Sequence, residues 1–293
     1  EELTEIADAA CAFSLDALRG TPRAFDARIH EARPHPGQLA SARFMERLLA
    51  GSEIRDSHRT CRHVQDAYSL RCAPQVHGAV RDTLAEMRRV FTIELNSATD
   101  NPLVFGDEIL SGGNFHGQHL ALAMDSAAIA LTALAGISER RIDRLVNPML
   151  SEGLPAFLAG HAGLESGYMM LQVTAASLVA ELRVLASPAS TGSITTSGNK
   201  EDFVSMGMTS ALKLADSVKL VRLVLAIELM TAARALEFLS PLKTSPMLER
   251  LQAAVEEVCP RRKEDAPFSG SIEAVAGWLR GWSIWRKMNL VFV

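Results

Sequence analysis

Aromatic side chains, cysteine motifs and excess positive charge are all scarce in this sequence. Aromatic residues make up 5% of the 293 residues, and the formal net charge is −4. Without a broad basic surface we do not expect nucleic acid as a partner. The four cysteines show no CxxC spacing, which is typical of reduced thiols, so we expect a cytoplasmic protein without structural disulfides.

The sequence also lacks a leader and an uninterrupted apolar run. Its first residues, "EELTEIADAACAF", are acidic rather than basic, so we expect no signal peptide. The most apolar stretch, "LVRLVLAIELMTAARAL", carries charges at Arg222, Glu228 and Arg234. We therefore expect no membrane span and no membrane partner.

What the sequence does have is helical periodicity. Alternating strand patterns are rare, and apolar residues recur at helical spacing through most of the chain. Glycine, proline and Asn-Pro pairs mark where helices end. The pattern predicts helices over residues 3–18, 37–50, 74–100, 118–146, 164–186 and 201–239.

The longest predicted helix indicates how the chain folds. A helix over 201–239 would span roughly 60 Å and would carry an apolar stripe along its length. Such a stripe needs similarly long neighbours, so we predict an all-α bundle of long helices in one unit. The unpaired stripes also predict an oligomer.

The segment "CRHVQDAYSLRCAPQVHGAVRD" combines an amide, a phenol and a guanidinium at intervals of three. On a helix Gln65, Tyr68 and Arg71 would share one face within about 120°. A guanidinium suits a carboxylate, and a phenol can donate or accept a proton. Spacing alone fits equally a polar seam in which Asp66 pairs with an arginine.

Two polar loops are further candidates. "SGGNFHGQH" (111–119) contains His116-x-x-His119, but no acidic partner completes a zinc pattern, so we predict no metal. "TTSGNKEDFVSMG" (195–207) leads into the 201–239 helix. Glu201 would then lie in a helix first turn, where the dipole favours an acidic residue. Alternatively, the loop brings Glu201 to a ligand.

Six segments in order together resemble the histidine ammonia-lyases and the wider aromatic amino acid lyase family. They are "QDAYSLRCAPQVHGAVRD", "ELNSATDNPLVF", "LSGGNFHGQHLALAMD", "SERRIDRLVNP", "GLESGYMMLQVTAASLVAE" and "SGNKEDFVSMG". The resemblance covers about residues 11–273. It implies the long-helix fold of the ammonia-lyases and fumarases, assembled as a homotetramer.

The resemblance also implies a methylidene-imidazolone electrophile, which the family forms from an internal Ala-Ser-Gly. That tripeptide is not in the 293 residues. Thr196-Ser197-Gly198 lies in the later loop and is not its equivalent. We interpret residues 1–276 as the C-terminal portion of such a lyase, to be completed by a segment that carries the electrophile, in a homotetramer or a hetero-assembly.

The family's site residues map onto six positions. Arg71 corresponds to the arginine that binds the substrate carboxylate, Tyr68 to the tyrosine beside the electrophile, and Gln65 to the glutamine that orients this group. Phe115 corresponds to an aromatic near the ring. Met169 and Glu201 correspond to side-chain pocket residues, and a carboxylate at 201 complements imidazole. We place Tyr68 and Glu201 in a catalytic role and the other four in substrate binding.

Two departures from the family pattern bear on function. Lys200 stands where the family usually has glutamine, and an ammonium there would compete for Glu201. Residues 277–293, "GWLRGWSIWRKMNLVFV", match no family pattern. The leading expectation is elimination of ammonia from L-histidine to give urocanate. Alternatives are a non-catalytic helical assembly protein or a lyase or aminomutase acting on phenylalanine or tyrosine. A fumarase-type lyase is disfavoured because its serine-loop signature is missing.

Overall fold

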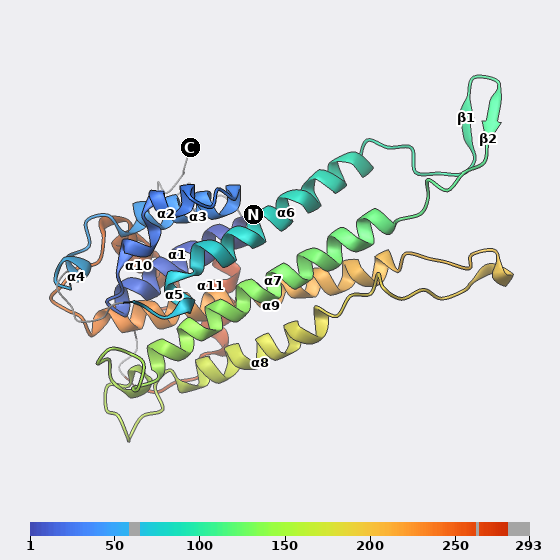
Figure 1. Cartoon of the computed structure of the whole chain (residues 1–293). Helices are drawn as coiled ribbons and strands as arrows, with labels where there is room; N and C mark the ends of the chain where they lie inside the picture. The colour runs from blue at the N-terminus through green and yellow to red at the C-terminus, as the bar shows by residue number, and fades with distance from the viewer. Residues whose placement is uncertain (59–64, 262–263, 281–293) are drawn as a thin grey trace.

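Long helices dominate the computed structural model, which describes residues 1–58, 65–261 and 264–280. The chain reverses direction between successive long helices, so that they run antiparallel along one axis (Figure 1). The predicted all-α bundle is confirmed. Its long members are α1 (Glu2–Ala17), α6 (Ala73–Glu94), α7 (Gln118–Val146), α8 (Met169–Leu185) and α9 (Gly207–Glu237).

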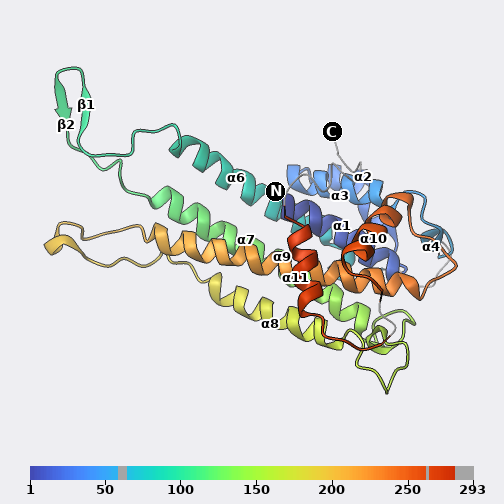
Figure 2. The same ribbon diagram turned by 180° about the vertical axis from the view of Figure 1, so that it is seen from behind.

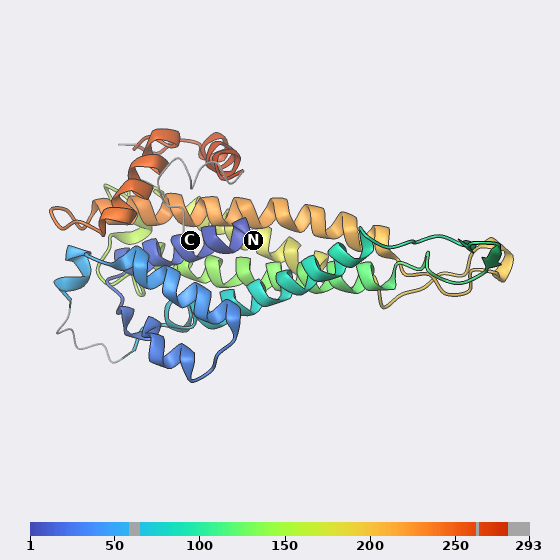
Figure 3. The same ribbon diagram turned by 90° about the horizontal axis from the view of Figure 1, so that it is seen from above.

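Helix α7 is the centre of the bundle and contacts α6, α8, α9 and α1. Shorter elements cover one end of it. Helices α10 (Pro246–Val258) and α11 (Ser269–Trp278) pack on α9, and α10 also contacts α3 (Pro36–Leu49), which packs with α2 (Ala27–Glu31) (Figure 3). The remaining short helices are η1 (Pro22–Phe25), α4 (Glu53–Asp56), α5 (Tyr68–Arg71), η2 (Ala156–Leu158) and η3 (Ser197–Asn199).

The two ends of the bundle differ. At the proximal end lie α5, the turn 147–168 and the other short helices except η3. At the distal end a hairpin of β1 (Leu103–Phe105) and β2 (Glu108–Leu110) and the loop 187–206 project beyond the helices (Figures 1 and 2). The hairpin is antiparallel, with Leu103 opposite Leu110. The tail residues 281–293 lie outside the described residues, as do 59–64 and 262–263.

Several predicted helix boundaries need correction. Helices predicted at 3–18, 37–50 and 118–146 agree to within one residue. The 74–100 helix ends at Glu94, because Asn96 and Ser97 turn their side chains back onto the carbonyls of Thr92 and Ile93. Polar side chains that bond to nearby backbone in this way compete with helix continuation.

The helices predicted at 164–186 and 201–239 both begin later than expected. Helix α8 starts at Met169, after Gly167 takes a left-handed conformation with φ 52°. Helix α9 starts at Gly207, because Met206 is itself left-handed, with φ 55°. A left-handed residue cannot continue a right-handed helix. Helix α9 is therefore about 46 Å long rather than 60 Å.

The hydrophobic core lies in the proximal half. From Val221 to Leu236 helix α9 is almost wholly buried, whereas its first turns leave Met208 74% and Leu212 62% exposed. Other apolar side chains of the distal half are exposed as well, namely Leu95, Val104, Phe105, Ile109, Leu110, Phe115, Leu122, Ile129, Val184, Ile194 and Phe203. Apolar exposure on this scale is typical of surfaces that bind another protein.

Two charged groups are fully buried in the middle of the core. The Arg141 guanidinium of α7 pairs with the Glu228 carboxylate of α9, at 2.6 Å from Nε to Oε1 and 2.8 Å from Nη2 to Oε2. Ser14 of α1 and Ser138 of α7 also donate to this carboxylate, at 2.8 and 2.5 Å. The pair therefore links three helices.

Helix α7 is long and apolar enough to cross a membrane by length and composition, with a mean hydropathy of 1.8 over its most apolar window. The expectation of no membrane span rests on the apolar stretch of α9 and does not take α7 into account. Half of that window is nevertheless buried inside the bundle, and the buried Arg141 lies on the same helix. This is typical of a core helix in a helical bundle.

Candidate functional site

The segment with Gln65, Tyr68 and Arg71 forms one short turn at the proximal end. Only residues 68–71 are helical, so Gln65 precedes the helix, and the three side chains do not share one helix face as predicted. Tyr68 and Arg71 do lie together, with the guanidinium carbon 4.5 Å from the centre of the phenol ring. Tyr68 is 71% exposed, and Gln65 is exposed too.

Asp66 organises this turn through its backbone carbonyl and its carboxylate. Its backbone carbonyl accepts a hydrogen bond from Arg71 Nε at 2.9 Å, and its carboxylate accepts one from the Thr21 amide at 2.7 Å. The Arg71 side chain is thereby held by its Nε. The Nη edge of the same guanidinium is the part that suits a carboxylate.

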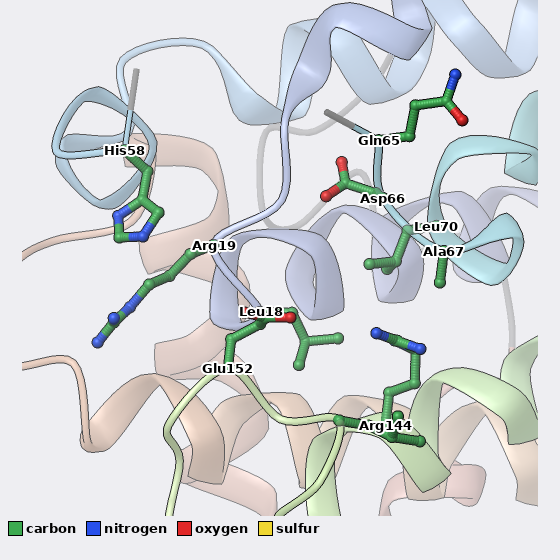
Figure 4. A pocket seen from close by; sticks show the side chains of 10 residues that line it. Leu18, Arg19, His58, Gln65, Asp66, Ala67, Leu70, Arg144 and Glu152 are labelled. Atoms are coloured by element: carbon green, nitrogen blue, oxygen red, sulfur yellow. The ribbon is translucent and has the colours of Figure 1, made fainter. Parts of the chain in front are cut away.

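A small cavity of about 70 Å³ lies next to this turn (Figure 4). Tyr68 and Arg71 are not among its lining residues, so it is not the amino acid pocket that the sequence predicted. The lining residues are Leu18, Arg19, His58, Gln65, Asp66, Ala67, Leu70, Arg144, Leu150 and Glu152.

Met169 also belongs to the proximal end. It is half-buried and is the first residue of α8, directly after the 147–168 turn that follows α7. Helix α8 therefore begins at the end of the bundle where α5 lies (Figure 1). Four of the six predicted positions, Gln65, Tyr68, Arg71 and Met169, thus share one end.

Phe115 lies at the distal end, just before α7. It is 58% exposed and lines a groove of about 510 Å³ between the end of α6 and the start of α7. The neighbouring His116 stacks on Phe203, with ring centres 6.0 Å apart, and its Nε2 lies 3.2 Å from the Phe203 carbonyl. This contact joins the "SGGNFHGQH" loop to the loop that carries Glu201.

Glu201 is in an exposed loop, not in a helix first turn as predicted. Residue 201 forms an isolated bridge with Thr196, and α9 begins six residues later. Its carboxylate accepts a hydrogen bond from the Thr196 hydroxyl at 2.6 Å. Hydrogen bonds from Thr196 and Ser197 hold the pKa of Glu201 below its usual 4.5. Ion pairs among the described residues do not include one between Lys200 and Glu201.

One chain therefore places the six predicted residues at two separate ends. Helix α7 starts beside Phe115 and ends near the 147–168 turn, and its 29 residues span roughly 43 Å. A single amino acid could not contact Arg71 and Glu201 of the same chain. Neither end alone offers an enclosed pocket with all six residues.

Sequence reasoning missed the buried polar network between the helices. Asp8 accepts from His77 Nδ1 at 2.7 Å, from Arg81 at 2.6 Å and from the Ser41 hydroxyl. Burial alone would raise the pKa of Asp8, but the hydrogen bonds from His77 and Ser41 and the charge of Arg81 outweigh it and hold that pKa below its usual 3.8. Burial lowers the pKa of His77 below 6.5. The sequence offers one signal of this network, namely single charged residues within apolar helix segments.

The sequence matches a known protein family over most of its length. The sequence model of the family described as "Aromatic amino acid lyase" matches residues 1–257. Histidine ammonia-lyase of Koribacter versatilis is 59% identical over 294 residues, covering 96% of this chain and 57% of that protein. Histidine ammonia-lyase of Caenorhabditis elegans is 51% identical, covering 96% of this chain and 42% of that protein.

Solved structures show the same fold. Histidine ammonia-lyase from Trypanosoma cruzi superposes with a TM-score of 0.90 at 43% identity, over 99% of this chain and 55% of that one. Tyrosine aminomutase from Streptomyces globisporus gives 0.93 at 40% identity, over 99% and 59%. The chain spans between 42% and 59% of the length of these relatives. The resemblance seen in the six motifs is confirmed, and the chain belongs to the aromatic amino acid lyase family.

Proposed function

We propose that this chain supplies the substrate-binding residues of an ammonia-lyase that converts L-histidine to urocanate and ammonia. The observation that carries the proposal is the turn Tyr68–Arg71, where an exposed phenol and a guanidinium lie 4.5 Å apart on a turn anchored to the bundle. In the elimination the Cα–N bond breaks, a proton leaves Cβ, and a carbon–carbon double bond forms.

Arg71 would bind the substrate carboxylate. Its Nε is already bonded to the Asp66 carbonyl, which fixes the plane of the guanidinium and leaves the two-pronged Nη edge for a carboxylate. Two parallel charge-assisted hydrogen bonds would set the position and the rotation of the amino acid. Holding the reacting group in place accounts for a large part of many enzymatic rate enhancements.

Tyr68 would exchange a proton with the substrate. Its ring lies against Arg71, so that a carboxylate held by the guanidinium places the adjacent Cα and Cβ near the phenol. A phenol can act as a general acid or base when it lies within hydrogen-bond reach. Its exposure allows an approaching substrate or a second chain segment to reach it.

The methylidene-imidazolone implied by the family would activate the amino group for departure. The present residues fit such a group in one respect, since both Gln65 and Tyr68 are exposed on the same turn and face outward from the bundle. A group carried by another segment can therefore approach them. The residue triplet from which the family forms it, Ala-Ser-Gly, would come from that segment.

Glu201 favours histidine as the substrate. Its lowered pKa keeps the carboxylate ionised at neutral pH, where it can accept a hydrogen bond from an imidazole N–H. Since Glu201 and Arg71 lie at opposite ends of α7, we propose that they meet between different copies of the chain. Antiparallel packing of copies would bring a distal end against a proximal end and would cover the exposed apolar surface.

A second candidate is an aminomutase acting on tyrosine or phenylalanine. The Streptomyces tyrosine aminomutase superposes at least as well as the Trypanosoma histidine ammonia-lyase, with TM-scores of 0.93 and 0.90. Both kinds of enzyme would use the same carboxylate-binding turn. The side-chain pocket, and Glu201 in particular, distinguishes the two.

The test is an assay of the chain with and without a segment that carries Ala-Ser-Gly, taken from a relative such as the Koribacter enzyme. We expect urocanate from histidine in the combined assembly and none from the 293-residue chain alone. Formation of a β-amino acid from tyrosine or phenylalanine would instead identify an aminomutase. A well-folded combined assembly without any product would favour a non-catalytic helical protein.

A further inference from the structure

Helix α5 is too short to be stable by itself. It has four residues and no side-chain cap at its N-terminus. Isolated helices of fewer than about 12 residues are marginal in water. Its position must therefore be imposed by contacts with the rest of the bundle. Since Tyr68 and Arg71 are its first and last residues, these contacts also decide where the phenol and the guanidinium lie.

One of these contacts comes from the centre of the core. Arg141 Nη1 donates to the backbone carbonyl of Ser69 at 3.2 Å, and Ser69 lies between Tyr68 and Leu70. The Leu70 side chain adds an apolar anchor, at 3% exposure. The two anchors hold the inner side of the turn, and Tyr68 is on its outer side.

The Arg141 side chain has little freedom of its own. It is fully buried, and Nε and Nη2 are bonded to the two oxygens of Glu228. Those oxygens also accept from Ser14 and Ser138. Three long helices thus fix one guanidinium, which uses its remaining Nη1 edge on α5.

Stability alone does not account for such a pair. Taking both charges out of water costs much of what their attraction returns, and apolar residues of the same volume often stabilise a core equally well. The geometry points to a positioning role: Arg141, held by Glu228, sets the backbone of α5 and thereby the place of Tyr68 and Arg71. The functional consequence rests on the function proposed above for these two residues.

The environment of Tyr68 can be measured directly, because the chain has only two tyrosines, Tyr68 and Tyr168. Protein labelled with 3-fluorotyrosine should give two fluorine resonances in NMR, and Tyr68→Phe assigns them. Tyr168 packs against Phe268 with ring centres 4.9 Å apart, and serves as the internal reference.

The main variant is Arg141→Met combined with Glu228→Leu, because removing one charge alone would leave the other buried and unpaired. Arg141→Lys is the second variant; a single ammonium cannot reproduce the fork to Glu228 together with the bond to Ser69. We expect the Tyr68 resonance to shift and broaden in both, with Tyr168 unchanged. A folded variant with an unchanged Tyr68 resonance would overturn the proposal.

Thr231→Ala is the matched control. Thr231 is buried on α9, and its hydroxyl donates to the carbonyl of Ile227 of the same helix at 2.7 Å. We expect both resonances to keep their positions. Hydrogen exchange on the unmodified protein gives a test without any variant. The amides of Leu70, Arg71 and Cys72 should exchange slowly despite the exposed surface beside them, and fast exchange would also overturn the proposal.

An activity measurement separates this inference from the proposed function. In an active assembly, Arg141→Lys should lower kcat/KM for histidine by about tenfold or more, while Thr231→Ala should not. If the Tyr68 resonance responds but no assembly is ever active, positioning stands and the proposed function fails. If the assembly is active and neither Tyr68 nor kcat/KM responds to Arg141→Lys, positioning fails and the proposed function stands.

Discussion

Single residues carry the chemistry of this chain, and Arg71 is the most informative of them. Its charge could be supplied by a lysine, but its planar fork could not. Hydrogen bonds to charged groups are worth about 1.5–3 kcal/mol each. In an active assembly Arg71→Lys should therefore lower kcat/KM for histidine by roughly 10- to 150-fold, with folding unchanged. Steady-state kinetics and circular dichroism provide the measurements.

The control for Arg71 has to be an arginine outside the site. Arg62 is close to Arg71 in the sequence, but it lies outside the described residues. Arg89 is a better choice, because it is exposed on α6 and pairs with Glu86 at 2.6 Å. We expect Arg89→Lys to keep full activity. Equal activity of the Arg71 and Arg89 variants would rule out the carboxylate role of Arg71.

A second residue-scale prediction concerns His77 and pH. Burial lowers the pKa of His77 below 6.5, so the unfolded chain binds more protons below about pH 6.5 than the folded chain. The stability contribution is complete above that pH and decreases as the pH falls. The Asp8 carboxyl next to it also has a lowered pKa, but it protonates in a more acidic range, near or below 3.8.

The melting temperature should therefore fall between pH 7.5 and 5.5, and His77→Gln should flatten that dependence. The glutamine amide can still donate to Asp8, so Asp8 keeps a hydrogen bond. His119→Gln, at an exposed position of α7, serves as the control and should keep the original dependence. If all three proteins lose stability with the same slope, buried His77 is not responsible for the effect.

Helix pairs set the frame for these residues, and α3 and α6 approach each other closely at two glycines. At Gly37 a Cβ would lie 2.3 Å from the Gly78 carbonyl, and at Gly78 it would lie 2.4 Å from the Gln38 backbone. Neither backbone can yield without moving a helix. We expect Gly78→Ala to lower the free energy of unfolding by about 1–3 kcal/mol, as other overpacking changes do.

Gly136 in α7 provides the opposite case. No atom outside its own neighbourhood lies within 4 Å of a Cβ placed there. Alanine favours a helix by about 1 kcal/mol over glycine, so Gly136→Ala should raise the free energy of unfolding. Urea denaturation of both variants measures the difference. A similar decrease in the free energy of unfolding for both variants would show that the close approach of α3 and α6 does not cause the loss of stability.

Elements whose ends have strong stop signals could be predicted from the sequence. Helix α7 is bounded by Gly117 and by Asn147-Pro148, and its limits are as expected. The start of α9 could not be predicted, because Glu201 and Asp202 imitate a helix first turn, while the left-handed Met206 is visible only in three dimensions. The same holds for Gln65, whose spacing from Tyr68 fits a helix that is not there.

At the scale of the whole molecule, the distal half leaves many apolar side chains exposed. Sequence periodicity predicted the apolar stripes, but only the fold shows that they remain exposed from Leu122 and Ile129 on α7 to Met208 and Leu212 on α9. Likewise, no spacing in the sequence could show that Arg71 and Glu201 lie at opposite ends of α7. Contacts between residues far apart in the chain depend on the fold and, for a shared site, on the assembly.

The exposed distal half predicts association. Sedimentation at micromolar concentration should give a species larger than the 31.7 kDa monomer. Leu212→Glu should weaken this association by placing a charge in the apolar surface, because burying a carboxylate without a partner is costly. Ile29→Glu, exposed on α2 at the proximal end, is the control. A monodisperse monomer for the unaltered chain would contradict the prediction.

Sharing of the site between copies can be measured most directly by mixing two inactive variants. Arg71→Ala removes the proximal group, and Glu201→Ala removes the distal group. In an active assembly each variant alone should be strongly impaired. If one site takes Arg71 from one copy and Glu201 from another, mixed assemblies should restore urocanate formation at about one quarter of the sites, since each contributing copy has an even chance of being the intact one. Mixed assemblies that stay as inactive as the separate variants would contradict the account.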